Sequence, residues 1–231
     1  MTDSLRGGGA SVTGDADGSA RYYKRDFWSR ENLKYTKPHY RLEKVSRIIN
    51  RIGQGRACSL FDVGCGPATL RHLLTPNIRY YGADIAIQEP APYLLEADFV
   101  EGPIQFGDKK FDIVLAQGFF EYVGEHQAQK FGEIAQIIKP GGIFLTTYVN
   151  FGHRDREIYW PYSNVQPFAD FRTSLAEHFD VRRYFPTSHN WRHGEPNRWA
   201  IREANMQLSM NFPLISPRLA VEYIVLCRPR Y

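Results

Sequence analysis

An aspartate and two glycines follow a predicted buried strand with a spacing that suits ligand binding. The stretch "CSLFDVGCGPATL" begins as an apolar run, reaches Asp62 near its end, and then turns through Gly64 and Gly66. Glycines at such a turn let the backbone bend sharply and approach a ligand closely, because no Cβ atom obstructs it. We expect this turn, with the small residue Cys65 between the glycines, to contact a ligand. A tight strand–helix turn without a ligand is the alternative.

Two more aspartates stand at the ends of the next predicted strands. Asp84 ends "IRYYGAD", where a carboxylate is placed to accept the two hydroxyls of an adenosine ribose, and Ile85 follows it. Asp98, followed by Phe99, ends "YLLEAD" and is placed to accept a hydrogen bond from an adenine amino group. An ordinary solvated aspartate is the alternative at both positions.

A fourth candidate is the turn formed by Gln117 and Gly118 after the apolar run "FDIVLA". In a parallel sheet the carboxyl ends of the strands form the edge that faces a ligand. We therefore expect these two residues to lie beside the three acidic positions.

The elements that must position these residues alternate between helix and strand. A helical stripe in "KPHYRLEKVSRIINRIG", with Pro38 near its start and Gly53 near its end, precedes the first strand. A short helix is expected around 68–74, and "EHQAQKFGEIAQIIK" predicts an amphipathic helix that "KPGG" ends before the strand "IFLTTYVN". The connections after Asp84 and Phe99 are too short for full helices. This alternation predicts a parallel, doubly wound α/β sheet.

Composition favours one globular domain. The chain has 231 residues, 43% of them hydrophobic, and a net charge of +4 without a dense basic run, so no nucleic-acid arm is expected. Three cysteines at unrelated spacings and the lack of a long apolar run predict a cytoplasmic protein without a membrane span.

Residues 1–20 are predicted to be a disordered tail, and residues 21–231 are predicted to form the domain. Within the domain we expect an N-terminal lid (21–37), a cofactor-binding core (38–150) and acceptor-side elements with the last strands (151–231).

The combined pattern resembles the class I S-adenosylmethionine-dependent methyltransferases, in particular the small-molecule branch with the ubiquinone/menaquinone-type enzymes (methyltransferase type 11-like). The resemblance rests on "LFDVGCGPATL", "YYGADI", "EADF", "FDIVLAQGFFEYV" and "IIKPGGIFLTTY", within residues 38–150. It implies a Rossmann-like, doubly wound, mostly parallel seven-stranded sheet with helices on both faces and a small cap over the acceptor site. S-adenosylmethionine is the cofactor that it implies.

The same resemblance assigns roles to the candidate residues. Asp62, Gly64 and Gly66 would hold the methionine moiety, Asp84 the ribose, Asp98 with Phe99 the adenine, and Gln117 the region near the sulfonium. Two positions depart from the family pattern. Ala68 stands where a third glycine is common, and Tyr122 follows Glu121 where relatives often carry histidine, which puts a histidine role there in doubt.

The acceptor is expected between the N-terminal segment and the last third of the chain. Tyr22, Tyr23, Trp28 and Tyr35 are dense enough to form an aromatic lid, although packing of an N-terminal helix on the sheet would explain them as well. Residues 151–231 contain eleven arginines, no lysine and eight acidic residues, so an anionic acceptor is one expectation. Ordinary surface arginines would explain the same count.

Catalytic residues are expected after the strand "IFLTTYVN". Tyr148, Asn150 and His153 follow one another near its end; we expect Tyr148 and His153 to be catalytic, with His153 as the general base, and Asn150 to contact substrate. His189 in the late connection is also expected at the substrate. His189 and His193, four positions apart, could form a metal pair on a helix, but Gly194 and Pro196 indicate a loop, so no metal site is expected.

The predicted reaction is methyl transfer to a small molecule at oxygen, with a small amine as the alternative acceptor. Three other classes stay open. A nicotinamide-dependent oxidoreductase fits less well, because Thr69 occupies the third position of a G-x-G-x-x-G pattern. A nucleic-acid methyltransferase lacks its usual N-P-P-Y tetrad or Pro-Cys nucleophile here. A cofactor-binding module without turnover is compatible with the sequence.

Overall fold

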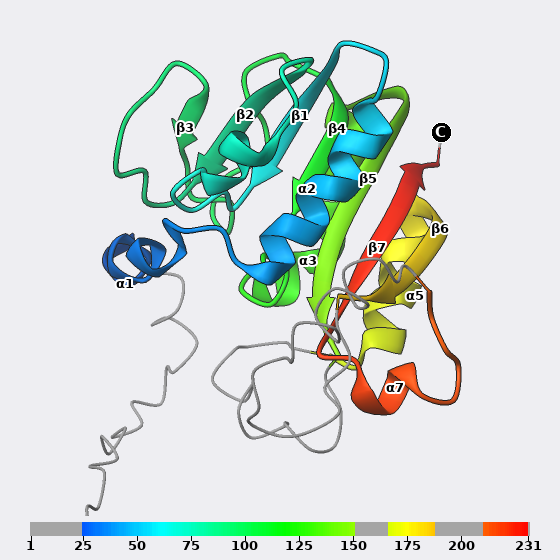
Figure 1. The fold of residues 1–231 in the computed structure, drawn as a ribbon. Helices are drawn as coiled ribbons and strands as arrows, with labels where there is room; N and C mark the ends of the chain where they lie inside the picture. The colour runs from blue at the N-terminus through cyan, green and yellow to red at the C-terminus, as the bar shows by residue number, and fades with distance from the viewer. Residues whose placement is uncertain (1–24, 151–165, 188–209, 231) are drawn as a thin grey trace, which may run out of the picture.

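The computed structural model describes residues 25–150, 166–187 and 210–230. These residues form a seven-stranded sheet of order β3-β2-β1-β4-β5-β7-β6 (Figure 1). The strands are β1 (Cys58–Val63), β2 (Ile78–Asp84), β3 (Leu94–Glu96), β4 (Phe111–Ala116), β5 (Ile138–Val149), β6 (Phe179–Pro186) and β7 (Glu222–Pro229). The first five pair in parallel, and β7 lies antiparallel between β5 and β6. The expected Rossmann-like, mostly parallel sheet is therefore confirmed.

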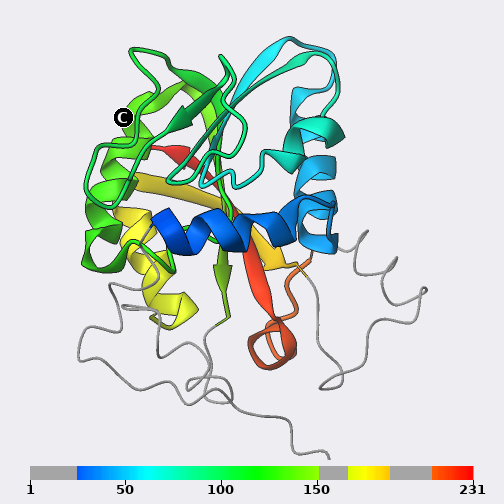
Figure 2. The ribbon, with the colours of Figure 1, turned by 90° about the vertical axis from the view of Figure 1, so that its left-hand side faces the viewer.

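Helices cover both faces of the sheet. α2 (Tyr40–Gly53) lies on one face, and α3 (Gln127–Ile137) and α5 (Phe168–His178) lie on the other, as the two views show (Figures 1 and 2). Successive side chains of a strand point to opposite faces, so each central strand contributes side chains to two apolar layers. Leu60 packs in the layer of Val45 and Ile49, whereas Phe61 packs in the layer of Phe131.

The N-terminal elements lie at the edge where the parallel strands end. α1 (Arg25–Glu31) runs across this edge and continues into the 3-10 helix η1 (Asn32–Tyr35) (Figure 2). The exposed ion pair between Arg25 Nη2 and Glu96 Oε1, at 2.8 Å, links α1 to β3. The remaining elements are η2 (Thr69–Leu73), η3 (Gly124–His126) and α7 (Ser216–Leu219).

The short helix expected around 68–74 is present as the 3-10 segment η2, preceded by Ala68 in the left-handed region at φ 55°. One local expectation was wrong. The "KPGG" turn does not separate α3 from the next strand, because β5 already begins at Ile138. Phe111 pairs with Ile138 and Ile113 with Ile143, so "KPGG" bulges out of the ladder.

The missing crossover helices were predicted correctly. No helix lies between β2 and β3 or between β3 and β4, two connections that the structure describes throughout. The edge of the sheet beside Asp84 is therefore left for other elements to cover. In the described part of the chain, no helix combines the length and apolar character needed to span a bilayer.

Candidate active site

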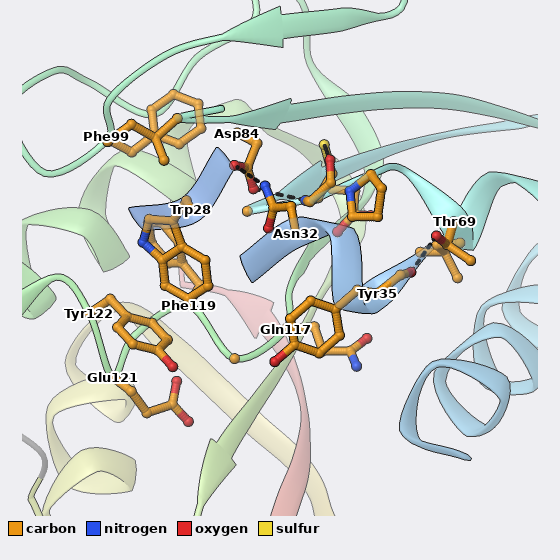
Figure 3. Close-up of a pocket in the computed structure, with 18 of the residues that line it drawn as sticks. Trp28, Asn32, Tyr35, Thr69, Asp84, Phe99, Gln117, Phe119, Glu121 and Tyr122 are labelled. Carbon is orange, nitrogen blue, oxygen red and sulfur yellow. Dashed lines mark hydrogen bonds between the residues drawn. The ribbon is translucent and has the colours of Figure 1, made fainter. Parts of the chain in front are cut away.

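A pocket of about 340 Å³ lies at the carboxyl ends of β1, β2 and β4, with α1 and η1 as its outer wall (Figure 3). Its size falls in the range typical of small-molecule sites. Its lining includes all ten residues expected at the cofactor, namely Asp62, Gly64, Cys65, Gly66, Asp84, Ile85, Asp98, Phe99, Gln117 and Gly118. The side chains of Trp28 and Tyr35, which were expected at the substrate, also line it.

The glycine turn is shaped by backbone conformations that other residues rarely adopt. Gly64 has φ 74° and Gly66 has φ 53°, both in the left-handed region. A Cβ atom would also lie 3.2 Å from the Phe119 ring at Gly64 and 3.3 Å from Asn32 Oδ1 at Gly66. No α-helix starts at this turn to supply free N–H groups. Instead the Gly66 N–H donates to Asp84 Oδ2 at 2.8 Å.

Asp84 is held by three donors from three segments. Besides Gly66, the Ala86 N–H donates to Oδ1 at 3.1 Å, and Asn32 Nδ2 donates to the same oxygen at 3.1 Å. Burial raises the pKa of the Asp84 carboxyl, and these hydrogen bonds oppose that rise. Asn32 carries no motif in the sequence and was not anticipated. Asn32 and Asp84 are 52 positions apart in the sequence, and only the fold brings them together.

A second contact fastens η1 to the glycine turn. The Thr69 hydroxyl donates to the Tyr35 carbonyl at 2.7 Å (Figure 3). Together with the Asn32 amide, it holds the N-terminal segment against the sheet edge.

Asp62 also lines the pocket and is buried. The Tyr80 hydroxyl donates to its Oδ2 at 2.9 Å. Burial raises the pKa of the Asp62 carboxyl to about 7, and the Tyr80 hydrogen bond opposes this shift. Burial also raises the pKa of the Cys65 thiol well above its ordinary value, which disfavours the thiolate that a nucleophile would need.

The turn after β4 carries a buried oxygen without a partner. The Gly118 N–H donates to Thr147 Oγ1 at 2.9 Å, which fixes the turn to β5. Gln117 Oε1 is buried and has no hydrogen-bond partner among the described residues. After β3, Asp98 Oδ1 accepts from the Val100 N–H at 2.9 Å, and Phe99 is buried.

The other end of the pocket contains a carboxylate that the sequence did not single out as functional. Glu121 Oε1 accepts from the Val149 N–H at 3.0 Å, whereas Oε2 has no partner in the described part of the chain. Arg41 Nη1 lies 2.7 Å from Glu222 Oε1 beside it. The Trp28 ring meets the Tyr122 ring edge-on, with centroids 4.9 Å apart. Figure 3 shows Glu121 and Tyr122 at the end of the pocket opposite Asp84 and Asn32.

Tyr148, expected to be catalytic, does not line the pocket. Its ring is fully buried and stacks on Phe171 at 3.8 Å, and its hydroxyl accepts from the Gln166 N–H at 3.0 Å. Burial raises the pKa of this phenol above its ordinary value. The adjacent Val149 lines the pocket instead, because neighbouring side chains of a strand face opposite sides. The placement argues against the expected role.

The other expected substrate residues divide into two groups. Asn150 does not line the pocket; its Nδ2 donates to the carbonyls of Pro217 and Ala220 and fastens the α7 segment. Tyr22, Tyr23, His153 and His189 lie outside the described residues. Within the described ranges, no three His, Cys, Asp or Glu residues are grouped so that they could hold a metal ion.

Comparison with known proteins agrees with this geometry. Residues 61–146 match a family model described as a methyltransferase domain. No curated protein sequence matches the chain. Similar solved structures include a TehB-like S-adenosylmethionine-dependent methyltransferase from Corynebacterium glutamicum, with 14% identity, 94% of this chain and 100% of that chain covered, and a TM-score of 0.54.

Two further structures share the fold. The Haloferax volcanii complex of the activator Trm112 with a methyltransferase has 18% identity, 89% and 96% coverage of the two chains, and a TM-score of 0.60. The N-methyltransferase NodS from Bradyrhizobium japonicum, solved with S-adenosylhomocysteine, has 11% identity, 81% and 86% coverage, and a TM-score of 0.52. The chain therefore contains a segment that matches a methyltransferase domain, within the fold of S-adenosylmethionine-dependent methyltransferases.

The pocket residues fit that cofactor. The left-handed glycine turn leaves no room for side chains, Asp84 presents a carboxylate at the end of β2, and Gln117 offers an unpaired buried oxygen. When bound, S-adenosylmethionine supplies a methyl group activated for nucleophilic attack.

Proposed function

We propose that this enzyme transfers a methyl group to a small molecule, at an oxygen atom. The observation that carries the proposal is the position of Glu121 in the pocket: a buried carboxylate with an unpaired oxygen stands at the end opposite Asp84. A hydroxyl acceptor gains most from a nearby proton acceptor, whereas a neutral amine needs less help. The modest volume of the pocket supports a small acceptor, and the small-molecule branch of the family is the group that fits it.

The roles of the cofactor residues belong to the same proposal. Asp84 would bind the ribose hydroxyls. The Asn32 amide already donates to Asp84 Oδ1 and would compete with a hydroxyl for that oxygen. Asp98 and Phe99 would bind the adenine, the turn from Asp62 to Gly66 the methionine moiety, and Gln117 the region next to the reactive methyl group. All of these residues line one pocket, which supports their acting on one ligand.

The N-terminal elements would form the lid over the acceptor. Trp28 and Tyr35 line the pocket, and the contacts of Asn32 and Thr69 hold this segment in place. Aromatic faces next to a cofactor cation stabilise it, and they also shield the reacting atoms from water.

The charges of the described lining do not favour an anionic acceptor. Arg41 is its arginine, and Glu222 already engages that guanidinium at 2.7 Å. Four carboxyl groups line the same pocket, on Asp62, Asp84, Asp98 and Glu121. A neutral acceptor, or one with a positive charge near Glu121, therefore suits the site better. NodS, an N-methyltransferase with the same fold, keeps a small amine as the alternative acceptor.

The test uses S-adenosylmethionine with a carbon-labelled methyl group. The enzyme is incubated with the small-molecule fraction of a cell extract, and labelled products are identified by mass spectrometry and by the carbon shift of the methyl group. We expect a methyl ether or ester. An N-methyl product would replace the oxygen assignment by the amine alternative, and label found only in added nucleic acid would overturn the small-molecule assignment. Binding without turnover in any fraction would indicate a cofactor-binding module.

A further inference from the structure

We propose that Glu121 is the acid–base residue of this site: its Oε2 binds the proton-bearing group of the acceptor and takes the proton. This inference rests on the proposed methyl transfer and adds the residue that activates the acceptor. It applies to a hydroxyl, which must lose its proton for methylation to give a neutral ether, and to a protonated amine, which must lose one proton to free the lone pair that attacks and which gives a methylammonium product.

The two oxygens of the Glu121 carboxylate have different surroundings. Oε1 accepts from the Val149 N–H at 3.0 Å, so the carboxylate is anchored between the turn after β4 and the end of β5. Oε2 is buried and has no hydrogen-bond partner among the described residues. A buried acceptor without a donor is costly. The anchored side chain therefore presents one oxygen ready to accept a hydrogen bond within the pocket that Glu121 lines.

Nearby charged groups do not supply the missing partner. Arg41 on α2 faces Glu121, but its Nη1 is engaged by Glu222 of β7 at 2.7 Å. The Tyr148 hydroxyl on β5 also interacts electrostatically with Glu121 and is hydrogen-bonded to the Gln166 N–H. The pair of Arg41 and Glu222 thus leaves Oε2 to a group that enters the pocket.

The same surroundings tune the proton affinity of the carboxyl group. Burial raises the pKa of Glu121 to about 7 and the Glu222 charge adds to this rise, whereas Arg41 opposes it. A general acid–base group works best when its pKa lies near the operating pH. Glu121 is therefore suited to accept and release a proton near neutrality.

The proton balance is simple. The O–H or N–H bond of the acceptor breaks, the proton passes to Glu121 Oε2, and the bonding electron pair stays on the acceptor atom as its nucleophilic pair. Release of the proton to solvent restores the carboxylate. The alternative role for Glu121 is purely structural, a brace through Oε1 that holds Val149. Replacement by glutamine separates the two roles, because its amide oxygen can still accept from Val149 while the charge is lost.

The experiment compares two cofactor analogues and needs no acceptor. S-adenosylhomocysteine lacks the transferred methyl group, whereas sinefungin carries an amine at that position. Calorimetry would measure both affinities for the wild-type protein, for E121Q and for the control E125Q, whose exposed carboxylate lies outside the pocket lining. Measurements at about pH 6 and about pH 8 lie on either side of the Glu121 pKa of about 7.

At about pH 8, we expect the wild type and E125Q to bind sinefungin more tightly than S-adenosylhomocysteine. In E121Q the ratio of the two affinities should be about tenfold smaller. At about pH 6, where Glu121 is protonated, the wild-type preference should also shrink. An equal preference in wild type and E121Q would overturn the proposal, and so would an equal loss in E125Q. If E121Q does not fold, infrared titration of the wild type replaces it: sinefungin should lower the pKa of one buried carboxyl relative to S-adenosylhomocysteine, and an unchanged titration overturns the proposal.

Failure of this inference is distinguishable from failure of the proposed function. A methyl ether product with a sinefungin preference unaffected by E121Q would remove only the role of Glu121. An N-methyl product with a preference that depends on Glu121 would remove only the oxygen assignment.

Discussion

The two ends of the pocket differ in how completely their polar groups are paired. At the end proposed for the ribose, called the ribose end below, Asp84 accepts from the Gly66 and Ala86 N–H groups and from the Asn32 amide. At the opposite end, proposed for the acceptor and called the acceptor end below, Glu121 Oε2 is buried without a partner among the described residues. The first end is preformed by the protein's own contacts. The second keeps hydrogen-bonding capacity for a ligand.

The origin of the residues explains this difference. The ribose end is built mainly from β1, the glycine turn and β2, which follow one another along the chain. The acceptor end joins α2, the turn after β4, β5 and β7, and its ion pair between Arg41 and Glu222 spans 181 positions. Changes at the acceptor end should therefore affect long-range packing, whereas changes at the ribose end should act mainly on cofactor binding.

The largest effect is expected from R41M. Loss of the guanidinium leaves Glu222, whose side chain is 4% exposed, as a buried charge beside Glu121. Removing one partner of a buried ion pair destabilises the fold, here by about 3 kcal/mol. This value is at the low end of the usual range because the Arg41 side chain is 34% exposed. Urea unfolding would measure the loss. The double variant R41M/E222M should recover most of it, and a single variant as stable as the wild type would contradict the coupling.

The second effect is a dependence of the free energy of unfolding on pH. Burial raises the pKa of Glu121 from 4.5 to about 7, so the native state holds this proton more tightly than the unfolded state. The free energy of unfolding should therefore fall as pH rises from about 4.5 to about 7, with about 2–3 kcal/mol from Glu121. The pKa of Asp62 is also raised to about 7 and adds its own share.

Chemical denaturation at several pH values checks this prediction. E121Q and D62N should each flatten the slope, and the double variant should flatten it most. A slope that neither change reduces would show that these carboxyl groups do not titrate in the expected window.

The smallest of the three effects is expected from D84A at the ribose end. Loss of the carboxylate removes the charge-assisted hydrogen bond proposed to the ribose and should weaken binding of S-adenosylhomocysteine by about 1–3 kcal/mol. D84N keeps one acceptor oxygen of the same shape and should lose less. Calorimetry on folded variants measures both. Unchanged affinity in D84A would contradict the ribose assignment.

The ten residues expected at the cofactor line one pocket, and the sequence could bring them together because their signals are local. Gly64 and Gly66 adopt left-handed conformations, and Asp84 ends a strand, features that short motifs encode directly. Tyr148, expected at the site, does not line the pocket, whereas its neighbour Val149 does. In a strand buried on both faces, the apolar pattern does not say which side chains face which layer.

The amino-acid sequence by itself determined the doubly wound sheet, the glycine turn and the row of aspartates at the strand ends. These depend on backbone conformation and on the period of apolar residues, which neighbouring positions specify. Only the tertiary structure decided that Asn32 reaches Asp84, and that Arg41 and Glu222 leave one oxygen of Glu121 unpaired. Those contacts join segments distant in the chain, and their formation depends on how helices and strands pack, which no local pattern records.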